Sequence, residues 1–220
     1  MLLLIYKITA LLIPIASFVV GFYSLYLNPK SKLVWLWFLT SLSVGLWGIG
    51  LFGLVIAPSY NQALFFDRFL HSFAVFIPVL YLHFILIFLH VNRKAITFFV
   101  MPAYVLSIIL SVLAWTSNLF VANAFSKVGF DYWVSGGPLY LLYIIYFVIC
   151  ITITFALLFY YFFRSDGIIK KQIAYIIIIS LIGFISGGTS FLPILFNIYP
   201  FGTFITFTYP LLVTYWIFKK

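Results

Sequence analysis

The chain has 220 residues, of which 66% are hydrophobic and only 7% are charged. A water-soluble domain is about one quarter charged, and a fold of this size cannot bury so much apolar surface. The composition therefore excludes a soluble globular protein and indicates an integral membrane protein. The net charge of +9 does not indicate nucleic-acid binding, because the basic residues lie in short segments between apolar runs.

Apolar runs divide the chain into seven predicted transmembrane helices, an all-α bundle. A helix of about 20 residues crosses ~30 Å of hydrocarbon. The first run has no basic n-region or small-residue cleavage site, so we expect a retained helix and not a signal peptide. No charge separates the last two runs, but one helix through both would be ~70 Å long, so the chain must turn between them. The runs are 2–27, 33–56, 63–90, 95–115, 138–163, 172–195 and 199–218.

The basic residues predict the orientation of the bundle. If seven helices alternate, nine of the twelve basic residues fall on one side, and the positive-inside rule makes that side cytoplasmic. We therefore predict a multi-pass protein of the inner or plasma membrane, with its N-terminus extracytoplasmic and its C-terminus cytoplasmic. The nine are Lys30, Lys32, Arg93, Lys94, Arg164, Lys170, Lys171, Lys219 and Lys220; Lys7, Arg68 and Lys127 fall on or near the other side.

One longer loop, about 116–137, lies on the predicted outer side and is rich in aromatic residues. Two interpretations are open: a small hairpin or lid on the mouth of the bundle, or an aromatic loop resting at the level of the lipid headgroups. The cytoplasmic loops, such as 28–32 and 92–94, are too short to hold a catalytic domain.

The residues that catalysis or metal binding would need are missing from the pattern. Of three acidic residues only Asp67 is near membrane depth, so no carboxylate pair can form there. His71, His83 and His90 all lie on the third predicted helix, and the first two are separated by ~18 Å of helix rise, too far for one metal ion or haem. Cys150 is the only cysteine. We expect no enzyme activity, no metal site and no cofactor.

Asp67, Arg68 and His71 form the candidate ligand-binding or signal-sensing cluster. Asp67 and His71 are four residues apart and share a helix face, and charged groups near the membrane tend to mark function. The cluster has two interpretations: it contacts a ligand or senses pH, or it anchors the start of the helix at the outer interface. His83, which follows Pro78, is a further candidate, and we expect it to make an interhelical hydrogen bond or a ligand contact.

Five segments resemble one family: FFDRFLH at 65–71, IPVLYLHFILIF at 77–88, GGPLYLLY at 136–143, KKQIAYIIII at 170–179 and FLPILFNIYPFG at 191–202. Over essentially its whole length the chain resembles the seven-transmembrane N-terminal sensor region of bacterial membrane histidine kinases. The resemblance implies a receptor module that detects an extracytoplasmic or lipophilic signal and passes it to a cytoplasmic kinase. The sequence has no phosphoacceptor or ATP-binding region, so we expect that output beyond Lys220 or on a partner chain.

The seventh predicted helix is the expected route of transmission in such a receptor, and a homodimer is possible. Pro200 and Pro210 lack an N–H and allow this helix to bend, while Trp216 sets its depth. Two other functions are open. One is a small seven-helix transporter, although we expect none of the clearly broken helices that are usual in ion-coupled carriers. The other is a non-catalytic membrane assembly subunit.

Overall fold

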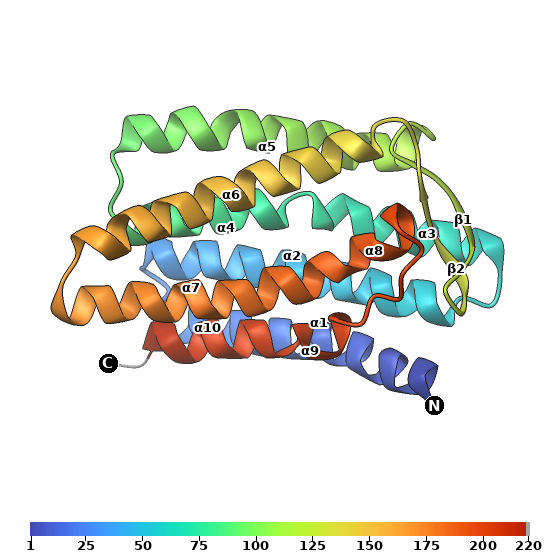
Figure 1. Ribbon diagram of the computed structural model, residues 1–220, viewed down its shortest axis with the longest axis horizontal. Helices are drawn as coiled ribbons and strands as arrows, with labels where there is room; N and C mark the ends of the chain where they lie inside the picture. Colours follow the sequence, from blue (N-terminus) through green and yellow to red (C-terminus); the bar gives the residue numbers. More distant parts are fainter. Residues whose placement is uncertain (219–220) are drawn as a thin grey trace.

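The protein is a bundle of long helices that run back and forth and is covered at one end by a β-hairpin (Figure 1). The structure is a computed structural model and describes residues 1–218, apart from the side chains of Arg93 and Ala95. Six helical segments are long and apolar enough to cross a membrane, and 203–218 forms a shorter seventh. The predicted all-α fold with seven transmembrane segments is confirmed.

Four crossings are single helices, and three are interrupted. The single helices are α1 (Leu2–Leu27), α2 (Lys32–Ile56), α5 (Arg93–Thr116) and α6 (Tyr140–Arg164). The interrupted crossings are α3 (Tyr60–Ala74) with α4 (Ile77–Phe88), α7 (Gly167–Gly188) with the 3-10 turn η1 (Thr189–Phe191) and α8 (Leu192–Leu195), and α9 (Thr203–Thr206) with α10 (Thr208–Phe218). The hairpin consists of β1 (Val121–Lys127) and β2 (Phe130–Gly136).

A proline accounts for each interruption. Proline lacks an N–H, and its ring clashes with the carbonyl group four residues earlier, so the helix ladder fails there. Pro78 lies four residues after Ala74, where α3 ends, and Pro210 lies four residues after Thr206, where α9 ends. Pro193 lies four residues after Thr189, the first residue beyond the end of α7. Each helix therefore stops where a proline removes the next backbone bond.

The hairpin covers the end of the bundle where the N-terminus lies (Figure 1). Its two-residue turn, Val128 and Gly129, has positive φ at both positions, as tight antiparallel hairpins require. The Phe130 ring packs against Tyr6 at 4.8 Å and stacks on Tyr199 at 5.2 Å between ring centroids. Of the two interpretations of this loop, the structure supports a hairpin that lies on the bundle.

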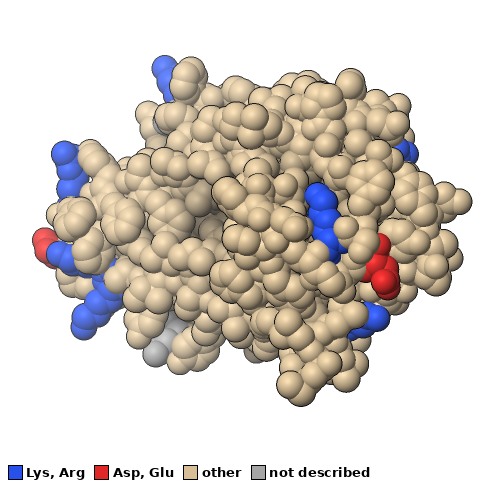
Figure 2. Space-filling view, turned by 45° about the vertical axis from the view of Figure 1, so that its right-hand side comes forward, with Lys and Arg blue, Asp and Glu red and all other residues tan. Residues whose placement is uncertain are grey.

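Charged residues gather at the two ends of the molecule, and Figure 2 shows a broad uncharged surface between them. We call the end with β1 and β2 the hairpin end and the opposite end the basic end. The alternation of seven helices that we predicted brings the basic loops to the same end of the bundle. Which end faces the cytoplasm stays a prediction. The described basic side chains near the basic end are Lys30, Lys32, Lys94, Arg164, Lys170 and Lys171.

Glycines on α2 allow its neighbours to approach closely. A Cβ placed on Gly48 would lie 2.7 Å from Cδ of Pro14 on α1, and one on Gly50 would lie 2.6 Å from Cβ of Leu70 on α3. Small residues at such positions let membrane helices pack backbone to backbone. This close packing holds α3 against α2 and so determines which face of α3 is buried.

Candidate functional site

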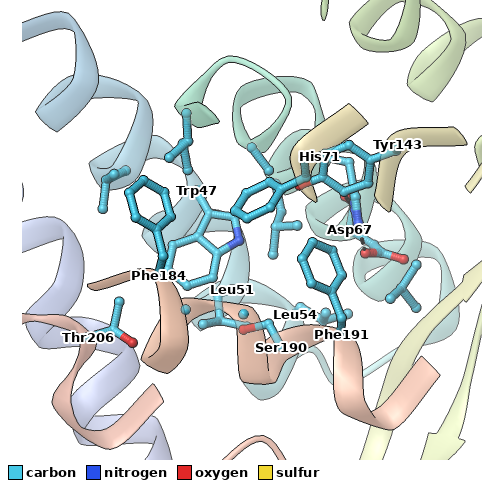
Figure 3. Close-up of a pocket in the computed structure, with 18 of the residues that line it drawn as sticks. Trp47, Leu51, Leu54, Asp67, His71, Tyr143, Phe184, Ser190, Phe191 and Thr206 are labelled. Carbon is cyan, nitrogen blue, oxygen red and sulfur yellow. Dashed lines mark hydrogen bonds and ion pairs between the residues drawn. The ribbon is translucent and has the colours of Figure 1, made fainter. Parts of the chain in front are cut away.

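A cavity lies inside the hairpin-end half of the bundle (Figure 3). The space that the centre of a water-sized molecule can occupy in it is about 80 Å³. One buried water needs roughly 10–15 Å³ by that measure, so the cavity has room for several waters or for a small ligand. Trp133 and Val134 of β2 are among the lining residues, so the hairpin forms part of the wall.

All three interrupted crossings border this cavity. Ala74 and Ile77 line it at the α3–α4 break, Gly188 and Ser190 line it at the α7–α8 break, and Thr206 lines it at the α9–α10 break. Non-helical backbone at membrane depth is tolerated where it is buried in protein or lines a cavity. The three breaks therefore occupy the place in the bundle where irregular backbone is least costly.

Side-chain hydroxyls satisfy backbone groups at the breaks. The Val75 carbonyl oxygen, between α3 and α4, accepts hydrogen bonds from Ser107 Oγ at 2.9 Å and from the Tyr146 hydroxyl at 3.1 Å. Near the second break, Thr189 Oγ1 accepts the N–H of Gly202 at 3.0 Å. The two bonds to Val75 come from α5 and α6, so tertiary contacts hold the α3–α4 interruption in place.

Asp67 and His71 lie side by side at one end of the cavity, and Phe184 and Thr206 lie at the other end (Figure 3). Asp67 is 0% exposed and His71 is 2% exposed. The Nε2 atom of His71 is 3.0 Å from the hydroxyl of Tyr140 on α6. With a proton on Nδ1, the neutral imidazole accepts that hydroxyl's hydrogen bond.

The Asp67 carboxylate has one close polar neighbour, His71, and no donor in hydrogen-bond geometry in the described structure. His71 Nδ1 is 2.8 Å from the main-chain oxygen of Asp67 and 3.1 Å from its Oδ1, and the ring N–H is directed at the main-chain oxygen. Both carboxylate oxygens are buried and have no hydrogen-bond partner. A buried carboxylate without partners is costly. Full burial is also not the environment of an interfacial anchor.

The other two candidate residues lie apart from this pair. Arg68 turns away from the cavity, and its Nη2 donates to Asn118 Oδ1 at 2.9 Å. Among the described side chains, Asp67 has no guanidinium or ammonium group within ion-pair distance. His83 does not line the cavity; its Nδ1 is 3.2 Å from the hydroxyl of Tyr104 on α5, the interhelical bond expected for it.

The residues predicted to transmit a signal are distributed over the last crossing. Pro210 lies in the first turn of α10, and the Trp216 ring packs against Phe88 of α4 at 5.0 Å. Pro200, which we predicted inside the seventh helix, lies instead in the segment 196–202 before α9. That segment turns the chain around at the hairpin end, so the predicted placement of Pro200 inside the helix is wrong, and its role in transmission stays a prediction.

The sequence did not indicate the aromatic lining of the cavity. Aromatic residues make up 23% of the chain and occur in every membrane crossing, so no spacing distinguished those that face the cavity. Within residues 1–218, no group of three or more histidine, cysteine or acidic side chains is placed to hold a metal ion. The aromatic residues that line the cavity include Trp47, Tyr140, Tyr143, Phe147, Phe184 and Phe191.

A family model described as the N-terminal 7TM region of histidine kinase matches residues 9–219. The match covers nearly the whole chain, including every element that borders the cavity. Comparison with curated proteins and with solved structures found no significant match.

Proposed function

Since the chain belongs to the family of N-terminal seven-transmembrane regions of histidine kinases, we propose that it binds a small ligand in the cavity and passes the signal to a cytoplasmic kinase. The observation that carries this proposal is Asp67, a fully buried carboxylate without donors, at the edge of a cavity that three helix breaks also border. The family is a sensor region without catalytic function. In this proposal the kinase output lies beyond Lys220 or on a partner chain.

We propose that the hairpin end is extracytoplasmic, in the inner or plasma membrane. Most basic residues lie at the other end, and the positive-inside rule places such residues on the cytoplasmic side. Single cysteines at Ser59 or Ser126, in a Cys150→Ser background, are expected to react with a membrane-impermeant thiol reagent in intact cells. Cysteines at Ser31 or Ser165 are expected to react only after lysis. The reverse pattern would overturn the orientation.

The relay to the kinase runs, in this proposal, through α9 and α10. Thr206 and Tyr209 line the cavity on either side of the α9–α10 break, and α10 continues from there to Phe218 at the basic end. A ligand shifts an equilibrium only if it prefers one of two conformations. A ligand that contacts this break can prefer one packing of α10 over another, and the displacement is then read at the C-terminal end.

Insertions after the last helix test the relay. A histidine-kinase core is fused after Lys220, and one, two, three or four residues are inserted at the junction. Rotation of α10 predicts kinase output that varies with helical phase and partly recovers at four residues, because a helix turn has 3.6 residues. Output that is the same for all four insertions would exclude a rotational relay.

Filling the cavity tests whether it controls output. A Cβ placed on Gly187 or Gly188 meets no heavy atom within 4 Å, so a side chain can start there without a clash and extend into the cavity that both residues line. In the kinase fusion, the double variant Gly187→Leu/Gly188→Leu is expected to change basal autophosphorylation by about fivefold or more, the size of a typical coupling free energy. Ile185→Leu, at a position exposed on the helix surface, is the matched control. If the double variant leaves kinase output unchanged, as the control should, the proposal is contradicted.

A transporter is the second candidate, and the three broken crossings favour it. We expected no clearly broken helices, and that prediction is wrong. Carriers often place their substrate site where discontinuous helices meet near the middle of the membrane. Uptake of a cavity ligand into proteoliposomes that is abolished by Gly187→Leu/Gly188→Leu would support transport. If there is no uptake and no effect on kinase output, the assembly-subunit interpretation is the one that remains.

A further inference from the structure

We infer that the ligand of this cavity is a small organic cation, such as a protonated amine with an apolar body, held by the Asp67 carboxylate and by aromatic rings. The inference rests on the proposed function and names the class of signal. Its first support is charge. Among the residues that line the cavity, Asp67 carries the only formal charge when His71 is neutral, and none is a lysine or arginine.

The second support is the hydrogen bonding of Asp67. Both carboxylate oxygens are buried without a donor, and the nearest N–H, on His71, is directed at a main-chain oxygen. His71 is held in that orientation by its second contact, to the Tyr140 hydroxyl. An ammonium group in the cavity would supply both the donors and the opposite charge that a buried carboxylate needs.

The third support is the aromatic lining. Rings attract cations through their negative faces, and cages of such rings recognise organic ammonium groups. Figure 3 shows Trp47, Phe184 and Phe191 around the cavity, with Tyr143 beside His71. The rings come from α2, α6, α7 and η1, so the cavity has aromatic walls on several sides.

The same features disfavour other ligands. An anion would face the carboxylate, and no lysine or arginine lines the cavity to balance its charge. A metal ion would find Asp67 and His71 but no third ligand of the usual kinds among the described residues. A purely apolar molecule would leave the carboxylate without a partner.

The test is a comparison of cations with neutral compounds of the same shape. The full chain is placed in zwitterionic nanodiscs, and binding of n-butylammonium and phenethylammonium is measured by calorimetry against 1-butanol and 2-phenylethanol. We expect at least one cation to bind about ten- to a hundredfold more tightly than its alcohol, as a hydrogen-bonded charge pair implies. Asp67→Asn should remove this preference.

Two variants make the result interpretable. Asp131→Asn, at an exposed position of β2, is the matched control and should keep the preference. Gly187→Leu/Gly188→Leu keeps the carboxylate but fills the space, and it should abolish binding of both cation and alcohol even if Asp67→Asn fails to fold. Equal affinity for cations and alcohols, or a preference that survives either Asp67→Asn or filling of the cavity, would overturn the inference.

The outcome separates this inference from the proposed function. Selective cation binding combined with a kinase output that cavity filling does not change would refute the sensor role and keep the cation site. Output that depends on the cavity, without any preference for cations, would refute the ligand class and keep the sensor role.

Discussion

Asp67 and Trp37 are both 0% exposed and both polar, yet the two halves of the bundle treat them differently. Towards the basic end, Trp37 Nε1 donates to Thr214 Oγ1 at 2.9 Å and joins α2 to α10. Towards the hairpin end, the Asp67 carboxylate has no donor and borders a cavity. A polar group inside a membrane protein is ordinarily paired by a neighbouring helix. The unpaired group therefore marks the half in which another molecule has something to bind.

The backbone differs between the halves in the same way. Around Trp37 the helices α2, α4, α7 and α10 run without a break, and Phe84, Ile176 and Val213 are each fully buried there. Around Asp67 three crossings are interrupted. Closely packed helices rearrange little, whereas interrupted helices beside a cavity can adopt a second packing. The comparison assigns stability mainly to one half and responsiveness to the other.

Removal of a large side chain from each half is expected to show the largest difference. Trp37→Ala leaves a void in a closely packed region and should lower the free energy of unfolding by about 3–5 kcal/mol. Trp47→Ala only enlarges an existing cavity, so it should cost less. Denaturant unfolding in detergent, followed by far-UV circular dichroism, measures both. Equal losses would remove the distinction between the halves.

Glycine replacement should show an intermediate difference. A Cβ on Gly48 would lie 2.7 Å from Pro14 and 2.8 Å from Ile13, so Gly48→Ala should destabilise the bundle by about 1–3 kcal/mol. Gly187 faces open space in a helix, and Gly187→Ala should be neutral or stabilise the protein by up to about 1 kcal/mol. The same unfolding measurement applies. An equal loss of stability in Gly187→Ala and Gly48→Ala would show that Gly187 does not face open space.

Removal of single polar groups should give the smallest and most specific effect. Thr214→Val leaves the Trp37 N–H without its acceptor and should cost about 0.6 kcal/mol, the average for hydrogen bonds between membrane helices, and at most about 1.7 kcal/mol. Asp67→Asn removes a carboxylate that no donor satisfies, so the free energy of unfolding should stay the same or rise. If Asp67→Asn were the more destabilising of the two, Asp67 would have a structural partner and would not be free for a ligand.

Local composition was enough to predict the crossings and the ends of the molecule. The thickness of the bilayer sets the length of an apolar run, and the cost of burying a charge keeps most lysine and arginine residues in the loops and at the helix ends. Helical periodicity was enough to predict that Asp67 and His71 share a face, and they lie side by side. These rules act along the chain or within one helix, so no knowledge of its neighbours is needed.

Tertiary structure decided which prolines interrupt a helix. Pro14 and Pro102 lie inside the continuous helices α1 and α5, whereas Pro78, Pro193 and Pro210 coincide with breaks. All five remove the same backbone bond, but only three coincide with an interruption, and at the α3–α4 break hydroxyls from α5 and α6 satisfy the Val75 carbonyl. The sequence shows where a ladder bond is lost, and the packing decides whether the helix continues.

Tertiary structure also decided the environment of Asp67 and the aromatic walls of the cavity. The sequence left open whether Asp67 anchors a helix end or faces the interior, because both positions suit a charge near the start of a membrane helix. Its burial depends on how closely α2 approaches α3 and on the hairpin above them. Those contacts join residues far apart in the chain, and a cavity exists only as the space that such contacts leave unfilled.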